Sequence, residues 1–593
     1  MRTRFGGARA GAAVLVLALV GAACGADAPA EEGPARGGTF KIAAAGDIDS
    51  FDPGKTTGTM GSLLMRVLVR TLVAYPAVDG ETGIEPVADI ASSEPAISPD
   101  GKRVVISLRP DVKYQPEVAG GRAVQSRDIR YAIERGFYPS VANPYARTYF
   151  AGIFVGDEAF LAAPGPDKNI AGIDVSDPAR IVFDLKAPVG DLLNRLALPM
   201  AAPVPEEYAK QFDVKPVSDY GANVAATGPY QLERSGSTVT GHKPGESITL
   251  VRNESWTASS DPIRKAYPDK IEVTEGLDEI TRTVDRVLSG EFDYAADIGL
   301  PADRAAEILN DDTAKTQLFF NAGNCMRFIS FNTTVKPFDQ LKVRQAIATL
   351  INKGDLLEAR GGKRTGDVAG HVLMPGMPGF LEAGGRTYDP FARAVEGSTL
   401  VRAQEMMKEA GYTTGQYDPE KKERPVLVVG IDEDFHRRIT DIVVKALTDL
   451  GIRVDRQDYK ASDVSGRFAS VPRSNVAVLP NAAWCWLYPD AATVIPPLFD
   501  GRKIAPAGNT NFSLLNDPEV NALIDQALAA RGKERADLWS RADRLIMDRV
   551  PVLPWLWERV PTLISPRVVN FQYLLPTTSL DLAVVAVKQA PAA

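Results

Sequence analysis

The sequence has little of what enzymes most often use for catalysis. It contains three histidines in 593 residues, and they lie far apart along the chain. No HExxH motif, Cys/His metal spacing, Walker-type phosphate loop or G-x-S-x-G elbow occurs in it. We therefore assign no catalytic residue, no metal ligand and no cofactor, and we favour binding over catalysis. A hydrolase assembled from distant Ser, His and Asp residues is the weaker alternative.

The three histidines sit in different local patterns. His242 lies in a polar turn and is expected at the surface. His371 follows Gly370 and precedes an apolar run, which favours packing in a core. His436 lies near the start of a predicted helix and is expected to be solvated.

The chain also lacks an excess of positive charge and a long apolar segment. Its net charge is −8, which argues against nucleic acid as a partner, because phosphate binding needs a basic face. Beyond the N-terminal region, no stretch is apolar over the roughly 20 residues that a membrane-spanning helix needs.

The N-terminus has the pattern of a signal peptide. Basic residues at 1–9 precede an apolar run at 12–20, and small residues at 21–23 lead to Cys24. The small residues ending at Cys24 resemble a lipobox, in which the cysteine is lipidated and becomes the mature N-terminus, although Gly21 stands where leucine is usual. The alternative is an ordinary secreted protein cut nearby. Residues 25–36 have the composition of a flexible tether.

The length of the chain predicts two or three domains, because a single core rarely serves so many residues. Short β-rich runs alternate with amphipathic helices, which is typical of mixed α/β domains. The strand candidates are 39–42, 104–108, 248–251, 328–331 and 426–429. The helix candidates are 126–136, 341–353, 400–410, 435–450, 518–530 and 533–549.

A series of short motifs occurs in a characteristic order along the mature chain. They include Gly37-Gly38-Thr39-Phe40, Phe51-Asp52-Pro53, Ser107 to Tyr114, Thr227-Gly228-Pro229-Tyr230, Gly290-Glu291-Phe292-Asp293, Phe331-Asn332-Thr333 and Val343-Arg344-Gln345-Ala346. Each is a weak signal alone. In this order the chain resembles the family 5 extracellular solute-binding proteins, the oligopeptide, dipeptide and nickel group of bacterial ABC importers, from Gly37 to its end.

The resemblance implies an α/β, two-lobed periplasmic-binding-protein-like fold with an extra subdomain inserted in the first lobe. The expected segments are 1–24 for the signal peptide, 25–36 for the tether, 37–78, 201–324 and 555–593 for lobe one, 79–200 for the insert, and 325–554 for lobe two. Hinges are expected near Gly323-Asn324 and within 551–557. The lobes of such proteins close over the ligand.

Two cysteines remain if Cys24 carries a lipid, and an exported chain reaches an oxidising space where a pair can form a disulfide. The residues alone leave open whether Cys325 and Cys485 meet. In some peptide-binding relatives, one cysteine precedes the first strand of lobe two and another follows a tryptophan in the cleft. The resemblance therefore implies a Cys325–Cys485 bridge.

The resemblance also places a ligand wall in each lobe. Lobe two would contribute Trp484, Trp486, Tyr488 and Asp490, where aromatic rings offer apolar area with polar handles. Lobe one would contribute the loop with Thr57, Gly58 and Thr59. The alternative is that one or two of these aromatics pack in the core.

One position departs from the peptide-binding pattern. In peptide-binding relatives, an aspartate two residues after the cysteine holds the peptide α-ammonium group. The matching residue here is Leu487, which argues against that mode of peptide binding. Asp490 is a weaker substitute.

The expected function is capture of a peptide or similar small molecule outside the cytoplasm and its delivery to ABC transporter permease subunits. The protein would be exported and lipid-anchored to the outer face of the cell membrane. A surface receptor or signalling lipoprotein without transport is the alternative from another functional class.

Overall fold

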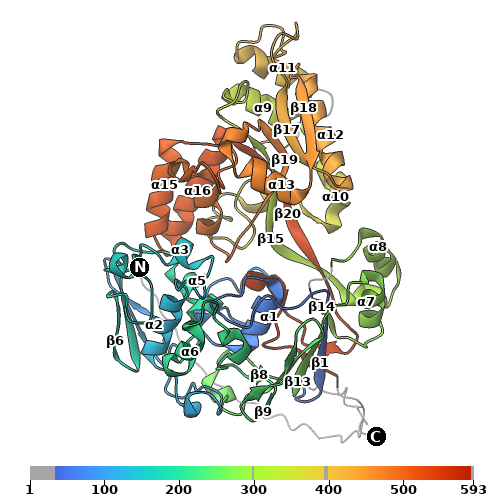
Figure 1. Cartoon of the computed structure of the whole chain (residues 1–593). Helices are drawn as coiled ribbons and strands as arrows, with labels where there is room; N and C mark the ends of the chain where they lie inside the picture. Colours follow the sequence, from blue (N-terminus) through green and yellow to red (C-terminus); the bar gives the residue numbers. More distant parts are fainter. Residues whose placement is uncertain (1–33, 297–298, 393–398, 589–593) are drawn as a thin grey trace, which may run out of the picture.

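The computed structural model describes residues 34–296, 299–392 and 399–588. The expected signal peptide and Cys24 lie outside these residues. Figure 1 shows two lobes, one above the other, with an additional subdomain beside the lower lobe. No helix in the described ranges combines the length and the apolar character needed to cross a membrane.

The first lobe is built on a six-stranded sheet in which β11-β12-β13-β1-β14 follow one another and β8 pairs with β12. Strand β1 is parallel to β13 and β14, while β12 is antiparallel to β13 and β8. Alternate residues of β12 and β13 are buried, as expected for strands with one covered face. The elements are β1 (Thr39–Ala44), α1 (Thr59–Leu68), β8 (Tyr230–Leu232), β11 (His242–Lys243), β12 (Ser247–Arg252), β13 (Lys270–Thr274), α7 (Ile280–Leu288), β14 (Tyr294–Ala296) and α8 (Ala302–Asn310).

Short two-stranded ribbons complete the first lobe. They pair β2 (Val73–Ala74) with β3 (Val87–Ala88), β9 (Arg234–Ser235) with β10 (Thr238–Val239), β21 (Val568–Val569) with β24 (Ala586–Val587), and β22 (Tyr573–Leu574) with β23 (Ser579–Leu580).

The inserted subdomain has an antiparallel four-stranded sheet in the order β4-β5-β7-β6. One continuous apolar cluster joins its residues to those of the first lobe, so the two parts share a core. The elements are β4 (Ala96–Ile97), β5 (Arg103–Ser107), α2 (Ser126–Arg135), α3 (Ala146–Tyr149), α4 (Asp157–Leu161), β6 (Ile173–Asp177), β7 (Arg180–Asp184), α5 (Leu192–Leu196) and α6 (Glu206–Asp213).

The second lobe has its own six-stranded sheet, in the order β16-β20-β15-β19-β17-β18, and apolar cores of its own. Its strands are β15 (Leu318–Phe331), β16 (Gly366–Asp367), β17 (Val426–Ile431), β18 (Val454–Tyr459), β19 (Val478–Cys485) and β20 (Val552–Leu563). Its helices are α9 (Leu341–Leu350), α10 (Lys353–Arg360), α11 (Thr399–Glu409), α12 (Asp434–Asp449), α13 (Ala461–Asp463), α14 (Ile495–Phe499), α15 (Pro518–Ala529) and α16 (Gly532–Arg549).

Two long antiparallel strands, β15 and β20, run from one lobe into the other (Figure 1). Their register shifts between Ala322 and Met326, which marks a break in the ladder between the lobes. On β20 the break lies opposite Trp557 to Arg559. A hinge near Gly323-Asn324 stays a prediction.

The expectation that His436 is solvated was wrong. His436 is only 5% exposed, and its Nδ1 lies 2.8 Å from the Asn481 side-chain nitrogen. His436 precedes Ile439 and Thr440 by three and four positions on α12, so it shares their buried face. The histidine expected to pack, His371, is fully buried and contacts Asp543 at 2.7 Å.

Candidate functional site

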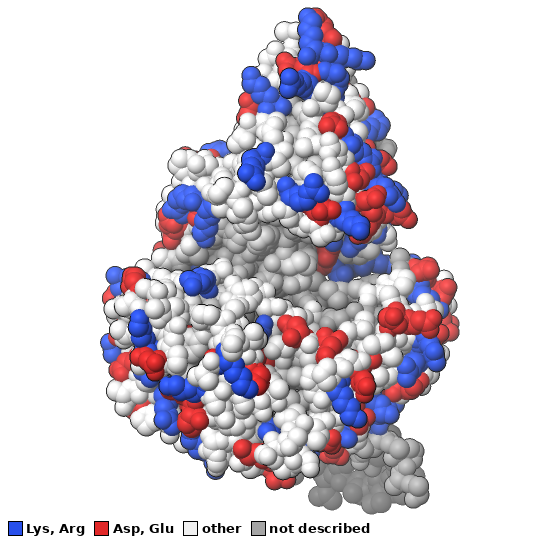
Figure 2. All heavy atoms as spheres, viewed as in Figure 1, with Lys and Arg blue, Asp and Glu red and all other residues white. Residues whose placement is uncertain are grey.

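A cavity with about 910 Å³ of space not filled by protein atoms lies where the first lobe, the insert and the second lobe meet. Figure 2 shows the hollow between the lobes, with few charged side chains near its centre. The lining residues are Pro53, Thr56, Thr57, Ser62, Met65, Arg66, Val69, Thr71, Ala74, Tyr75, Asn143, Tyr145, Ala197, Leu198, Pro199, Met200, Arg264, Leu487, Tyr488, Leu574, Pro576 and Thr577.

The first-lobe loop at 56–58 is held by one carboxylate. Asp49 accepts hydrogen bonds from the Thr57 and Gly58 backbone nitrogens at 2.6 and 2.9 Å and from Thr56 Oγ1 at 2.7 Å. These hydrogen bonds fix the loop directly before α1 and hold the pKa of Asp49 below its usual value, although partial burial opposes this shift. The Thr57 side chain remains exposed, so its hydroxyl is accessible at the cavity wall.

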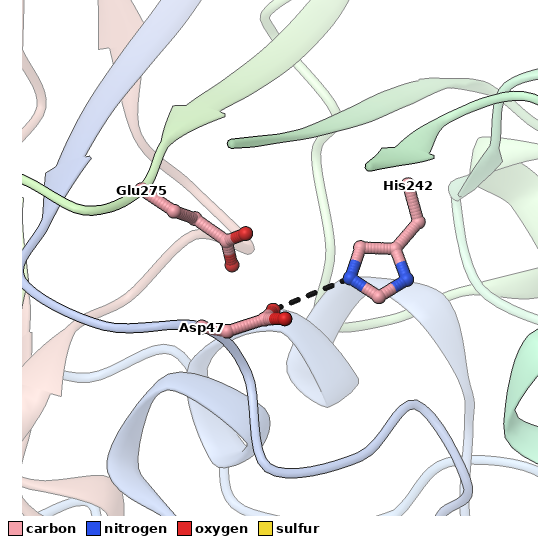
Figure 3. A group of neighbouring side chains, drawn as sticks. All are labelled: Asp47, His242 and Glu275. Atoms are coloured by element: carbon pink, nitrogen blue, oxygen red, sulfur yellow. Dashed lines mark hydrogen bonds and ion pairs between the residues drawn. The ribbon is translucent and has the colours of Figure 1, made fainter. Parts of the chain in front are cut away.

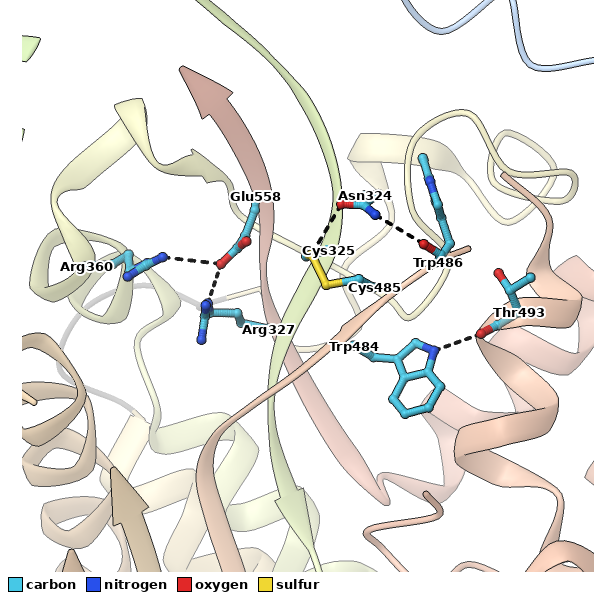
Figure 4. The surroundings of a disulfide bond; sticks show 9 residues. All are labelled: Asn324, Cys325, Arg327, Arg360, Trp484, Cys485, Trp486, Thr493 and Glu558. Atoms are coloured by element: carbon cyan, nitrogen blue, oxygen red, sulfur yellow. Dashed lines mark hydrogen bonds and ion pairs between the residues drawn. A yellow bond between two sulfur atoms is a disulfide. The ribbon is translucent and has the colours of Figure 1, made fainter. Parts of the chain in front are cut away.

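The second-lobe segment begins at the predicted disulfide, which the structure confirms between Cys325 of β15 and Cys485 of β19 (Figure 4). The two tryptophans beside Cys485 are used for packing. Trp484 donates its indole N–H to the Thr493 carbonyl at 2.8 Å and packs on Phe512. Trp486 is 3% exposed in the second-lobe core.

Tyr488 connects the second lobe to the insert. Its hydroxyl donates a 2.7 Å hydrogen bond to Asp191 Oδ2, and its ring packs edge-on against Tyr149. Arg195 pairs with the same carboxylate at 2.9 Å. Tyr488 therefore lines the cavity and also bridges the two sides of the cleft.

Asp490 is committed to the second lobe. Both of its carboxylate oxygens accept hydrogen bonds from Arg535, at 2.6 and 3.0 Å, and one also caps the turn at Ala492. Asp490 is 3% exposed and does not line this cavity. In this arrangement Asp490 acts as a structural ion-pair partner.

The charged residues that line the cavity are two arginines, and both are neutralised. Arg66 forms a two-pronged pair with Asp581 at 3.0 and 3.1 Å. Arg264 contacts Asp89 at 2.9 Å and Asp261 at 3.3 Å, within a buried group that also contains Arg70. Among the described residues, no aspartate or glutamate lines the cavity.

The phenols at the cavity remain protonated donors. Burial raises the pKa of Tyr75 and of Tyr145, and it raises the pKa of Tyr488 well above its usual value. With the threonine and serine hydroxyls, Tyr75 and Tyr145 give the cavity uncharged groups that both donate and accept hydrogen bonds, whereas the Tyr488 hydroxyl already donates to Asp191.

The predicted site residues fall into two groups. Thr57 and Tyr488 line the cavity, with Gly58 and Thr59 next to Thr57, whereas Trp484, Trp486 and Asp490 do not line it. Asp490 lines a separate cavity between the insert and the second lobe, together with Glu81, Glu94 and Arg535. Leu487, at the position where the resemblance implies an aspartate in peptide-binding relatives, also lines the first cavity. The sequence did not predict a role at the site for Tyr75, Tyr145, Arg66, Arg264, Ser62, Thr71 or Thr577, because the resemblance assigns no binding role to their segments.

The two lobes, their two connecting strands and the cavity between them define a two-lobed binding protein. The family model described as bacterial extracellular solute-binding proteins, family 5 middle, matches residues 85–505. The chain therefore belongs to the family 5 bacterial extracellular solute-binding proteins.

Individual relatives agree with this assignment. The glutathione-binding protein GsiB of Salmonella typhi is 23% identical over 545 residues, covering 91% of this chain and 93% of the relative. Heme-binding protein A of Haemophilus influenzae is 24% identical over 83% of this chain and 82% of its own. The solved structure of clavulanic acid biosynthesis oligopeptide binding protein 2 has a TM-score of 0.80 and 28% identity, covering 94% of this chain and 96% of that chain.

Proposed function

We propose that this protein is an exported, lipid-anchored solute-binding protein that captures a small ligand between its lobes and delivers it to the permease of an ABC importer. The observation that carries this proposal is the cavity lined by first-lobe, insert and second-lobe residues in a family 5 chain. The lipid anchor would be attached at Cys24, at the end of the apolar N-terminal run. Capture by two lobes follows the hinge-closure behaviour of such folds.

The lining indicates the class of ligand. Carbon-rich side chains such as Met65, Val69, Leu198 and Leu574 offer apolar area, and hydroxyl groups offer neutral hydrogen bonds. A bound ammonium group would need an opposite charge or several acceptors, since burying an unpaired charge is costly. The expected ligand is therefore peptide-like and amphiphilic, with no free α-ammonium group inside this cavity.

The relatives are compatible with such a ligand without defining it. Their names give glutathione, heme and oligopeptides as the bound molecules. These differ widely in shape and charge, so the family admits different ligands on one fold. The absence of a lining carboxylate from this cavity is the observation that supports the proposed ligand class.

Native mass spectrometry of the protein purified from its own host tests the proposal, because a closed cavity retains its ligand. A panel of short peptides, each with a free or an acetylated N-terminus, then tests the ligand class by calorimetry. We expect the acetylated member of a pair to bind at least about tenfold more tightly, which corresponds to about 1.4 kcal/mol. Preference for the free amine would contradict the ligand class, and failure to bind any solute would contradict the function.

Uptake assays in cells test delivery to the permease. We expect solute uptake to be lost when Cys24 or the gene for the partner permease is deleted. The uptake defect should be restored by the intact chain and not by a Cys24→Ala variant in cells where release from the membrane dilutes the protein. Normal uptake without the permease would favour a receptor role instead.

A further inference from the structure

Three potential metal ligands meet at one end of the first-lobe sheet, outside the cavity. Asp47 follows β1, His242 begins β11, and Glu275 directly follows β13. One ligand atom from each residue lies within 4.8 Å of the others. Figure 3 shows the three side chains converging from these separate segments.

Glu275 provides the observation that points to a ligand. Glu275 is 5% exposed, and its Oε1 accepts a hydrogen bond from the Ile48 backbone nitrogen at 3.2 Å. Its other oxygen, Oε2, is buried and accepts no hydrogen bond from any described residue. A buried carboxylate oxygen without a partner is costly, and the side chain is directed toward Asp47 and His242 (Figure 3).

The other two ligands are already oriented toward each other. His242 Nε2 lies 3.2 Å from Asp47 Oδ1, and Asp47 Oδ2 accepts a hydrogen bond from the Gly245 backbone nitrogen at 3.1 Å. The Phe51 ring packs edge-on against the imidazole, with 4.9 Å between ring centroids. These contacts restrict both side chains before any cation arrives.

We propose that Asp47, His242 and Glu275 form a binding site for a divalent transition-metal cation, with Zn²⁺ as its representative. Metal–nitrogen and metal–oxygen distances of about 2.0–2.2 Å place tetrahedral neighbours about 3.3–3.6 Å apart, close to the 3.2 Å between His242 Nε2 and Asp47 Oδ1. Small side-chain shifts bring Glu275 to the same separation. One imidazole and two carboxylates suit Zn²⁺ or Mn²⁺, whereas Ca²⁺ takes six to eight oxygen ligands.

The position of the site indicates a structural role. A cation there joins the ends of three segments, at residues 47, 242 and 275. Two residues after Asp47, Asp49 anchors the loop that carries Thr57 at the cavity wall. None of the three ligands lines the cavity, so the cation is a component of the first lobe and distinct from the transported solute.

Metal content and calorimetry test this site directly. The mature protein, purified through a tag without histidines and stripped with a chelator, is dialysed against Zn²⁺ and measured by plasma mass spectrometry. We expect one Zn²⁺ per chain and a higher melting temperature. We expect Glu275→Gln and His242→Gln to bind Zn²⁺ at least about tenfold more weakly, and Ca²⁺ to produce no saturable heat.

Matched variants keep the result interpretable. Glu272→Gln changes a carboxylate on the same strand, β13, that contacts Lys270 and not the site, and it should leave Zn²⁺ binding unchanged. Asp47→Asn alters an exposed ligand, so it tests the site even if Glu275→Gln fails to fold.

Two results would overturn the site. One is the absence of stoichiometric Zn²⁺ in the unaltered protein. The other is equal Zn²⁺ binding by the unaltered protein and the folded ligand variants. A Glu275→Gln variant that is more stable than the unaltered protein, with no metal bound to either, would show that Asp47 and Glu275 share a proton instead. Since no solute is needed, these outcomes are independent of the proposed transport function.

Discussion

The first lobe and its insert supply nearly all of the cavity lining, whereas the described part of the second lobe between β15 and β20 contributes Leu487 and Tyr488. The two sides are also held in different ways. The disulfide and the hydrogen bond from Trp484 to the Thr493 carbonyl fix the second-lobe segment, and the Asp49 carboxylate holds the first-lobe loop. The aromatic-rich segment is therefore mainly a rigid support, and the first lobe with its insert carries most of the cavity lining.

The largest effect is expected from removing the covalent support of the second lobe. The Cys325→Ser/Cys485→Ser double variant should lose about 2–5 kcal/mol of unfolding free energy, since the bridge constrains the unfolded chain. Chemical denaturation measures this loss, and hydrogen exchange should show it mainly in β15 and β19. An unchanged stability, or a loss spread evenly over both lobes, would contradict the conclusion that the disulfide mainly supports the second lobe.

Acid should weaken the second lobe through His436. Burial, reinforced by Arg327 and Arg360, lowers the pKa of His436 to about 4. Because the unfolded chain binds the proton more tightly, stability is lost as the pH falls from about 6.5 toward 4, by up to about 3 kcal/mol. Unfolding measured across this range should show a shallower pH slope in His436→Gln; an identical slope would exclude His436 as the source.

The insert should respond to pH with the opposite sign. Burial raises the pKa of Glu134 to about 7, although it accepts a 2.6 Å hydrogen bond from the Ile170 nitrogen. Stability is therefore complete below about pH 4.5 and decreases as the pH rises through 7, by about 2–3 kcal/mol. Glu134→Gln keeps the acceptor and should remove this decrease. A variant that is less stable at pH 8 would refute the assignment.

Closure across the cleft should weaken when the contact between its sides is cut. Tyr488→Phe removes the hydrogen bond to Asp191. A hydrogen bond with one charged partner contributes about 1.5–3 kcal/mol. Small-angle scattering should show a larger radius of gyration, because the open form gains population. Tyr459→Phe, which removes a hydroxyl contact to Gln457 within the second lobe, serves as the matched control.

The smallest effect is expected at the first-lobe loop. Asp49→Ala removes the acceptor of the Thr57 and Gly58 backbone nitrogens and should cost about 1 kcal/mol. Faster hydrogen exchange at 56–60 and weaker ligand binding should accompany the loss. Asp311→Ala removes a comparable acceptor, for Thr313 and Ala314, and should leave the loop unaffected. Equal protection of residues 56–60 from hydrogen exchange in both variants would argue against Asp49 as the anchor of the loop.

The elements of the fold were largely predictable from the sequence. All five strand candidates lie within or largely overlap observed strands, and the six helix candidates match α2, α9, α11, α12, α15 and α16 to within a few residues. Apolar periodicity is a local property, which explains this success. The family resemblance supplied the cysteine pair, which no local pattern could provide.

The site was less predictable because its residues are selected by tertiary contacts. Trp486 and Tyr488 are two positions apart, yet one enters the core and the other faces the cavity. The Asp47, His242 and Glu275 group has no recognisable spacing, because its members meet only when the segments after β1 and β13 and the start of β11 come together at one end of the folded sheet. His436 was misplaced since polarity at a helix start does not reveal which face is covered.

The Cys325–Cys485 bridge also determines how the chain responds to force. It spans a sequence separation of 160 residues, and the loop it closes contains α9 to α13 and β16 to β18. Tension applied to the two ends passes through the sulfur atoms, so this loop is not stretched. At about 3.3–3.6 Å per residue, roughly 500–600 Å of contour length stays hidden until the bridge is reduced. An oxidised molecule pulled from its ends would extend as a shorter chain, with much of its second lobe shielded from the load.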